Sequence, residues 1–543
     1  MTNASTSDLE QPSRRYSEQA KKPKEYPDYV TYLTCFDQDE PETVQEALSG
    51  EDREEWSKAM NQEYEALMNN DTWELTDLPP GKNVVRSKWV FKLKRNSSGQ
   101  IIEHKARLVA KGFSQKFGID YFETFSPVIR FDSLRLLFAL AVKYDLYIDH
   151  LDVKSAFLHA NLDEEIYMKQ PQNFEIKGKE AKVCRLRKAL YGLKQASKAW
   201  YETNHEFFTK LGFEQLQLEP CIYVLCKEDR FLIIALFVDD SLIFYKDKTF
   251  ADRVRDQIKK KFDLKDLGPV SYFLGTKVSH EPGKLKLDQT AYVHNLLQRF
   301  NMEDCKPEST PMEHNLYLLK ATECANVPYQ QLVGCLMFLA VTTRPDICYC
   351  VNKLSQFNIC HSEEHYTYLK RVLRYLKATP DLGLVFDKEE KFLVGFVDSS
   401  FGKSHDGKST SGFVFKMMGG AVAWASRKQT CVADSSTEAE YVAMTLAAKQ
   451  ASFMKHLLEE LGINIEAVSL SGDNKSALKL TKLCNITRRT QHIQIKYHFI
   501  RQAVQDNLVK LSYVPSADNP ADIFTKPLGR VKFQKFVNLL GLF

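Results

Sequence analysis

The chain has 543 residues, long enough for several domains of roughly 100–200 residues each. Apolar residues (44%) and charged residues (27%) have the proportions of a soluble globular protein, and no apolar run reaches the roughly 18–20 residues of a membrane span. The net charge of +4 excludes a chain that is basic throughout, so any polyanion site must come from local clustering of charge.

The twelve cysteines are scattered and lack the paired spacing of a zinc site. Free thiols in a reducing compartment fit this pattern, and the N-terminal residues are Thr/Ser/Asn-rich rather than signal-like. We therefore expect an intracellular protein.

Order begins after a polar tail, which we place at residues 1–53. Trp56, Met60 and Leu67 recur at helical spacing and predict an amphipathic helix over 54–69. Alternating residues then predict a β-hairpin with strands near 89–93 and 101–109, which carries Lys105 and Arg107. A cationic hairpin can hold a triphosphate, although lysines on a solvated face are the commoner explanation.

The next apolar strand, 146–152, ends in Asp152. An acid at the end of a strand can cap a helix or serve as a metal ligand, and the local pattern leaves both open. Phe157 follows five residues later. Residues 188–201 alternate basic residues, aromatic residues and Gly192, a pattern that suits contacts to the nucleic-acid backbone and stacking on nucleobases.

Two apolar runs flank Asp239 and Asp240, which predicts two buried strands joined by a tight turn carrying both acids. Adjacent carboxylates repel each other, and a divalent cation would remove the cost of keeping both ionised. Simple turn chemistry is the alternative, since Asp hydrogen-bonds its own backbone in turns.

A linker with helices is expected over 306–390, followed by a new unit from Lys391. Its pattern predicts a βββαβαβα-like arrangement in which four acids lie at strand ends or helix starts. These acids are far apart in sequence, so only folding could bring them together; they are Asp398, Glu440, Asp473 and Asp522.

The motifs along the chain resemble, in collinear order, the reverse transcriptase and then the ribonuclease H of copia-type LTR retrotransposon Pol polyproteins. The stretches that carry this resemblance include Trp89-Val90-Phe91-Lys92, Lys105-Ala106-Arg107-Leu108-Val109-Ala110-Lys111-Gly112, Leu190-Tyr191-Gly192-Leu193-Lys194-Gln195, Phe237-Val238-Asp239-Asp240, Arg344-Pro345-Asp346-Ile347 and Ala521-Asp522-Ile523-Phe524-Thr525-Lys526-Pro527-Leu528.

The resemblance implies an α+β fold: a right-hand polymerase with fingers, palm and thumb, followed by a ribonuclease H-like α/β domain. The implied division is a tail at 1–53, the polymerase at 54–305, a linker and helical connection at 306–390, the ribonuclease H-like domain at 391–530 and a C-terminal tail at 531–543.

The resemblance also implies roles for individual residues. Asp152, Asp239 and Asp240 would bind two Mg²⁺ ions, or Mn²⁺ in their place, and Asp398, Glu440, Asp473 and Asp522 would bind two more. Around the polymerase site, Lys105 and Arg107 would contact the triphosphate, Phe157 would exclude the 2′-hydroxyl, Gln195 would line the nucleotide pocket, and Phe273, Leu274 and Gly275 would grip the primer.

The implied activity is RNA-directed DNA polymerisation with cleavage of the RNA strand of a hybrid. Its partners would be an RNA template, a DNA primer, the RNA–DNA hybrid and dNTPs, with no membrane but with element-encoded integrase or capsid, in a cytoplasmic virus-like particle with a nuclear phase. The alternative is a degraded or co-opted remnant that binds nucleic acid without catalysis.

Overall fold

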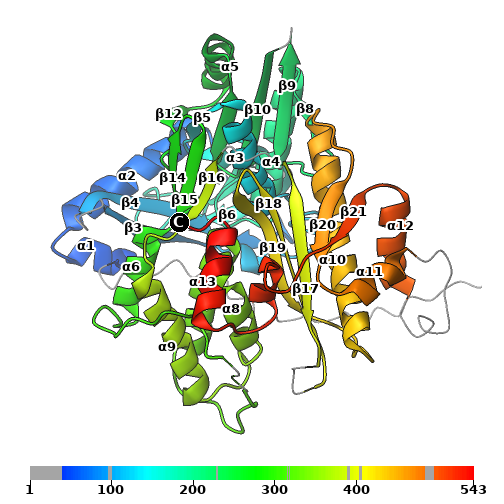
Figure 1. The fold of residues 1–543 in the computed structure, drawn as a ribbon. Coiled ribbons are helices and arrows are strands. Elements are labelled where there is room, and N and C mark those ends of the chain that lie inside the picture. The colour runs from blue at the N-terminus through cyan, green and yellow to red at the C-terminus, as the bar shows by residue number, and fades with distance from the viewer. Residues whose placement is uncertain are drawn as a thin grey trace, which may run out of the picture.

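The computed structural model describes residues 40–95, 101–227, 230–314, 316, 318–387, 392–402, 406–482 and 495–543. Its helices and strands are grouped around several β-sheets, and the predicted α+β class is confirmed (Figure 1). None of the helices in this described part is both long enough and apolar enough to span a bilayer.

The N-terminal unit combines a long helix, a basic β-hairpin and a four-stranded sheet of order β1-β7-β6-β2. Its elements are α1 (Val44–Ser49), α2 (Arg53–Asn69), β1 (Trp73–Thr76), β2 (Val84–Val85), β3 (Ser87–Arg95), β4 (Ile101–Ala110), η1 (Gly112–Ser114), β6 (Asn161–Lys169) and β7 (Val183–Lys188).

The predicted tail at 1–53 is wrong at its C-terminal end, because α1 forms there and packs on α2. The Glu40 carboxylate is buried and accepts a hydrogen bond from the Leu93 N–H at 3.0 Å, which ties this segment to the hairpin. Residues 1–39 lie outside the described residues.

The central sheet is antiparallel, with strand order β12-β5-β11-β10-β9-β8. Alternate residues of β10 enter two different cores: Ile233 and Ala235 face one, Leu232 and Ile234 the other, which is why the strand is apolar on both faces. The elements here are α3 (Phe131–Tyr144), β5 (Tyr147–Val153), η2 (Ala156–His159), α4 (Ala196–Lys210), β8 (Glu214–Gln215), β9 (Ile222–Lys227), β10 (Arg230–Phe237), β11 (Asp240–Tyr245), α5 (Lys248–Lys261) and β12 (Leu264–Pro269).

A small sheet of order β13-β14-β15-β16 and a group of helices connect the two ends of the chain. Within it, the Arg344 guanidinium and the Asp346 carboxylate form a buried ion pair at 2.8 Å. The elements are β13 (Tyr272–Phe273), β14 (Thr276–Glu281), β15 (Lys284–Asp288), α6 (Thr290–Arg299), α7 (Tyr329–Thr342), η3 (Pro345–Ile347), α8 (Cys348–Ser355), α9 (Glu363–Ala378) and β16 (Leu384–Asp387).

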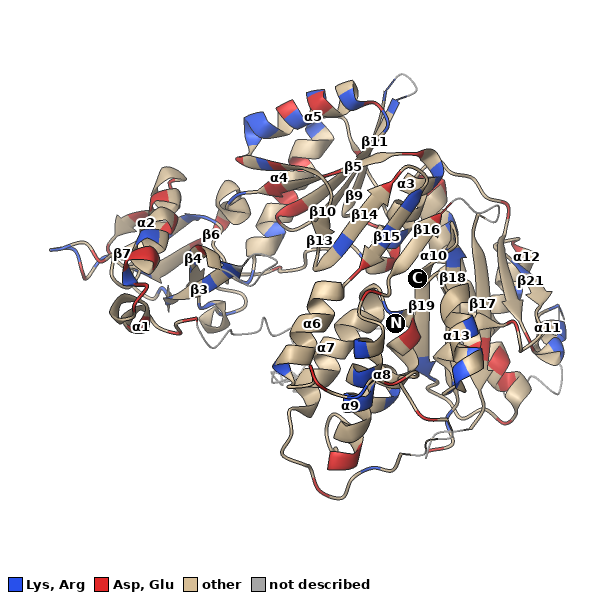
Figure 2. Ribbon diagram, turned by 60° about the vertical axis from the view of Figure 1, so that its left-hand side comes forward, with Lys and Arg blue, Asp and Glu red and all other residues tan. Residues whose placement is uncertain are grey.

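The C-terminal sheet has the order β19-β18-β17-β20-β21, antiparallel among its first three strands and parallel from β17 to β21. In Figure 2 it lies at the opposite end of the molecule from the hairpin β3–β4. Its elements are β17 (Val394–Ser400), β18 (Thr410–Met417), β19 (Gly420–Lys428), α10 (Ser436–Glu460), β20 (Val468–Gly472), α11 (Lys475–Thr481), η4 (Ile495–His498), α12 (Phe499–Gln505), β21 (Val509–Tyr513), η5 (Pro520–Phe524) and α13 (Arg530–Leu539).

The predicted C-terminal tail at 531–543 is also wrong. Phe533, Phe536 and Val537 of α13 are buried in the core, and the Phe543 N–H donates to the Gly383 carbonyl at 3.0 Å. The last residues therefore join the C-terminal unit to the strand β16 that precedes it.

The buried side chain of Arg135 is one of the links between helix α3 and the C-terminal sheet. The Arg135 guanidinium of α3 donates to the Val422 carbonyl of β19 at 2.8 Å and lies 3.8 Å from the centre of the Trp424 ring. Because guanidinium groups on aromatic faces are favourable and Arg135 is buried, this contact holds the two units in one orientation.

Candidate active sites

The two predicted strands form a hairpin, but its turn carries Asp239 alone, because Asp240 is the first residue of β11. Strand β10 pairs with β11 up to Phe237 and Asp240, so Val238 and Asp239 form the turn. On its other edge β11 pairs with β5, where Asp240 lies directly opposite Asp152. The fold therefore brings Asp152, Asp239 and Asp240 to one end of the central sheet.

The turn itself is strained. Val238 has a φ of +56°, a left-handed conformation that a β-branched residue adopts only under constraint from its surroundings. The constraint here includes the Trp200 indole N–H, which donates to the Val238 carbonyl at 2.6 Å. Strain of this kind clusters at functional sites, where the surrounding structure over-determines a costly geometry.

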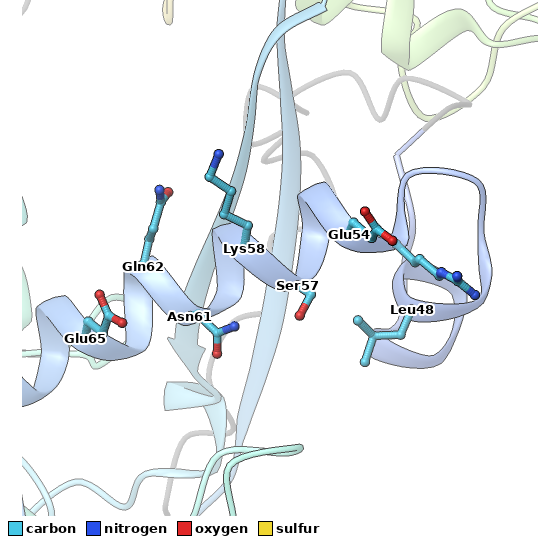
Figure 3. A pocket seen from close by; sticks show the side chains of 8 residues that line it. Leu48, Glu54, Ser57, Lys58, Asn61, Gln62 and Glu65 are labelled. Atoms are coloured by element: carbon cyan, nitrogen blue, oxygen red, sulfur yellow. The ribbon is translucent and has the colours of Figure 1, made fainter.

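A cavity of about 180 Å³ opens beside this turn. Asp152 and Asp239 line it together with Lys105 and Arg107 of the hairpin β3–β4, so the predicted carboxylates and the predicted cations share one space. The remaining lining residues are Glu63, Val153, Lys154, Ser155, Leu158, Leu190 and Tyr191. A larger open hollow of about 580 Å³ on the outer face of α2 is lined by none of the predicted site residues (Figure 3).

The electrostatics of this cavity favour a cation. Burial, followed by repulsion from Asp240 and Asp239, raises the pKa of Asp152, while burial lowers the pKa of Lys105. Carboxylate oxygens are the ligands that Mg²⁺ prefers, so Asp152 and Asp239 suit a hard divalent ion in kind. Among the described residues, however, the oxygens of Asp152, Asp239 and Asp240 do not all lie within 4.8 Å of one another.

Asp240 is directed differently from its neighbours. Its carboxylate lies 2.8 Å from the His150 Nε2 atom, and it does not line the cavity. The Phe273 ring meets the His150 ring edge-on, with centroids 5.4 Å apart, so the segment Phe273, Leu274 and Gly275 lies close to Asp240. Leu274 and Gly275 both have positive φ values in the turn between β13 and β14.

Gln195 does not lie in the same cavity. Its side-chain amide is buried, donating to the Asp120 carbonyl at 2.9 Å and accepting from Gln115 at 3.1 Å. Gln195 lines a separate hollow with His159 and Glu164, and its role in the nucleotide pocket stays a prediction.

Tyr191, in the same sequence motif, lines the cavity that holds Arg107 and Asp239. Its hydroxyl donates to the Asp239 Oδ2 atom at 3.2 Å, and its ring lies 4.9 Å from the Arg107 guanidinium carbon and 4.5 Å from the Phe157 ring. The neighbouring Gly192 could have indicated this placement, because a glycine allows close backbone approach. A Cβ at Gly192 would lie 2.1 Å from the Ala110 carbonyl oxygen, so this glycine lets its loop pack against β4.

The four acids of the C-terminal unit also converge. Oxygens of Asp398, Asp473 and Asp522 lie within 4.8 Å of one another, the sole such trio of acid, His or Cys ligands in the described part of the chain. Glu440 of α10 accepts from the Ser399 N–H at 3.0 Å, and its Oε2 atom is buried with no hydrogen-bond partner among the described residues.

Burial dominates the titration of this cluster. It raises the pKa of Asp398 to about 7 and that of Glu440 to about 9, with repulsion from neighbouring acids as a further cause. Carboxylates that resist ionisation and one unpartnered oxygen both fit a site for a divalent cation.

Three residues that sequence reasoning gave no role lie against these acids. The Lys526 ammonium is 2.9 Å from Asp522 and 3.5 Å from Asp398. The Thr525 hydroxyl donates to Asp398, and the Lys532 ammonium donates to Asp522. Thr525 and Lys526 belong to the motif that begins at Ala521. That motif therefore contributes two further polar residues to the site besides the acid Asp522.

Comparisons with known proteins found both similar sequences and similar folds. Residues 70–314 match the family model "Reverse transcriptase (RNA-dependent DNA polymerase)". The chain is 41% identical, over 98% of its length, to the "Retrovirus-related Pol polyprotein from transposon TNT 1-94" of Nicotiana tabacum, and 38% identical over 96% to that of transposon RE1 of Arabidopsis thaliana. Nearly the whole chain is therefore similar to a part of these retrotransposon Pol polyproteins.

The chain spans 41% of the length of the Nicotiana protein and 36% of the length of the Arabidopsis one. Among solved structures, a foamy viral protease-reverse transcriptase in complex with dsDNA matches with a TM-score of 0.46 and 13% identity, covering 85% of this chain and 83% of that one. RNase H1 of Halobacterium salinarum covers 25% of this chain and 95% of its own, with 19% identity and a TM-score of 0.18.

Proposed function

We propose that this chain is an RNA-directed DNA polymerase with ribonuclease H activity. The observation that carries the proposal is the cavity at the Asp239 turn, where Asp152 and Asp239 face Lys105 and Arg107. Carboxylates and cationic side chains that share one cavity suit a nucleoside triphosphate that binds together with a divalent cation.

The polymerase residues have separable tasks. Lys105 and Arg107 hold the triphosphate, and Asp152, Asp239 and Asp240 hold two Mg²⁺ ions, with Asp240 turning from His150 to do so. Phe157 closes the pocket beneath the sugar through its contact with Tyr191. The segment Phe273 to Gly275 positions the primer end close to Asp240.

In the C-terminal unit, Asp398, Glu440, Asp473 and Asp522 hold the second pair of ions and orient water toward the RNA strand. That strand is distinguished from DNA by its A-form geometry and 2′-hydroxyls. When bound at either cluster, Mg²⁺ supplies charge neutralisation and lowers the pKa of the attacking hydroxyl or water.

The proposal predicts that the purified chain extends a DNA primer on an RNA template in Mg²⁺, and that EDTA stops extension because the carboxylates then lose their counter-ions. Gel-resolved extension of a labelled primer measures this. A chain that binds the primer–template in a gel-shift experiment but never extends it would instead be the remnant that binds without catalysis.

Phe157 gives a second prediction. Phe157→Ala should lower the preference for dNTPs over rNTPs by about 100-fold, because a methyl group leaves room for the 2′-hydroxyl. The ratio of kcat/KM values for the two sugars measures it, and Phe157→Tyr, which keeps the ring, should retain discrimination.

Since Phe157 is buried, its loss can destabilise the fold, and Phe157→Val provides a milder truncation. Unchanged sugar discrimination in both truncated variants, with dNTP incorporation intact, would remove Phe157 from the role of gate.

A further inference from the structure

An acidic side chain lies in the cavity that is proposed to receive a polyanion. Glu63 comes from α2, outside the hairpin and the central sheet, and lines the same space as Lys105, Arg107 and Asp239. A carboxylate placed there repels a triphosphate, so its presence needs an explanation other than substrate binding.

One contact fixes the Glu63 side chain to the hairpin. Its Oε1 atom accepts a hydrogen bond from the Leu108 N–H at 3.2 Å, and Leu108 directly follows Arg107 on β4. The Leu108 side chain is fully buried, so this strand cannot shift without disturbing the core. Glu63 therefore sets the position of the peptide that carries Arg107.

The same carboxylate lies in the field of both cations. Burial raises the pKa of Glu63, while the Leu108 hydrogen bond and the nearby Arg107 and Lys105 lower it. The Tyr191 ring lies 4.9 Å from the Arg107 guanidinium carbon. Arg107 is thus oriented by an aromatic ring and is close to a carboxylate before any substrate arrives.

We propose that Glu63 is a positioning residue that also limits how tightly the cavity retains phosphates. With Glu63 ionised, the side chains of Glu63, Lys105 and Arg107 carry one net positive charge rather than two. Such a balance weakens the hold on the pyrophosphate product and so favours its release. This inference rests on the proposed polymerase function, because only that function gives the cavity a pyrophosphate to release.

The alternative is that Glu63 only secures the strand. Glutamine separates the two roles, because its carbonyl oxygen still accepts from the Leu108 N–H while its charge is lost. A purely structural role predicts that Glu63→Gln binds phosphates as the wild type does; a role in charge balance predicts tighter binding.

The experiment measures the affinity of the full chain for inorganic pyrophosphate in Mg²⁺ by isothermal titration calorimetry. We expect Glu63→Gln to bind about tenfold more tightly than wild type, since removing a unit charge at this range has an effect of that order. Glu63→Asp, which keeps the charge, should stay within about twofold of the wild type.

Glu65→Gln is the matched control, because Glu65 lies on the same helix but lines the outer hollow (Figure 3). It should leave pyrophosphate affinity unchanged. In primer extension, Glu63→Gln should lower the KM for dNTPs and the inhibition constant for pyrophosphate together, without a matching rise in kcat.

Equal or weaker pyrophosphate binding by Glu63→Gln, with an unfolding midpoint like that of wild type, would overturn the inference. This readout does not depend on turnover. Failure of the wild type to extend primers would overturn the proposed function, whereas normal extension with unaltered pyrophosphate binding in Glu63→Gln would overturn only the role of Glu63.

Discussion

Primer extension by Asp239→Asn is expected to fall by about 1,000-fold or more, because the substitution removes one charge from the cavity that we propose holds the triphosphate and its counter-ions. Asparagine has nearly the same shape and tolerates the turn, and its side-chain oxygen can still accept the Tyr191 hydroxyl hydrogen. Single-turnover extension on an RNA template measures the effect without interference from product release.

The matched control is Asp256→Asn on α5, which makes the same substitution at an exposed position. It should extend primers as the wild type does. If Asp239→Asn retains more than a tenth of the wild-type extension rate, the cavity at this turn is not the polymerase active site. This conclusion would hold even if the wild type extends primers efficiently.

Two continuous apolar runs made the Asp239 hairpin predictable, because strands buried on both faces are apolar throughout and the two acids interrupt them. The register that places Asp152 opposite Asp240 could not be read from the sequence. It depends on the pairing of β5 with β11, which are distant along the chain, and local patterns carry no information about which strands meet.

The residues expected to line the nucleotide pocket show a second limit of prediction from the sequence. Gln195 and Tyr191 belong to one motif, and a motif alone does not say which side chain points into a cavity. Only the structure separates them: the Tyr191 hydroxyl donates to Asp239, whereas the Gln195 amide joins a buried network with Gln115 and Asp120.

The errors at the ends of the chain have separate causes. Helix α1 has only six residues, too few to display a helical period. Helix α13 did carry the signal, since Phe533, Phe536, Val537 and Leu540 recur at helical spacing, but its short length and terminal position resembled a tail.

In the C-terminal unit, Glu440→Gln is expected to lower hybrid cleavage by about 1,000-fold or more while leaving primer extension within about twofold of wild type. Glutamine can still accept from the Ser399 N–H, but it cannot offer the second charged oxygen that is buried and unpartnered at Oε2. Cleavage of a labelled RNA–DNA hybrid and extension of a primer, measured on the same preparation, separate the two activities.

The control is Glu466→Gln, an exposed glutamate in the same unit, which should affect neither activity. Loss of both activities in Glu440→Gln would mean that the two units do not act separately, and normal cleavage would remove Glu440 from the site.

The pH dependence provides a test of folding that is independent of activity. Burial raises the pKa of Glu440 to about 9 and that of Asp398 to about 7, so the folded state holds these protons more tightly than the unfolded chain does. The stability they contribute is fully present below the unfolded pKa values near 4 and is lost as the pH rises through the folded values.

Without metal, the wild type should therefore unfold at a lower temperature at pH 9 than at pH 6. Glutamine cannot ionise, so Glu440→Gln should lose less stability over this interval and should melt above the wild type at pH 9. A misfolded variant would instead melt below the wild type at pH 9. Thermal unfolding in EDTA therefore distinguishes a variant that has lost only the metal site from one that has lost the fold. A Glu440→Gln melting curve with the same pH slope as wild type would show that Glu440 is already ionised in the folded chain.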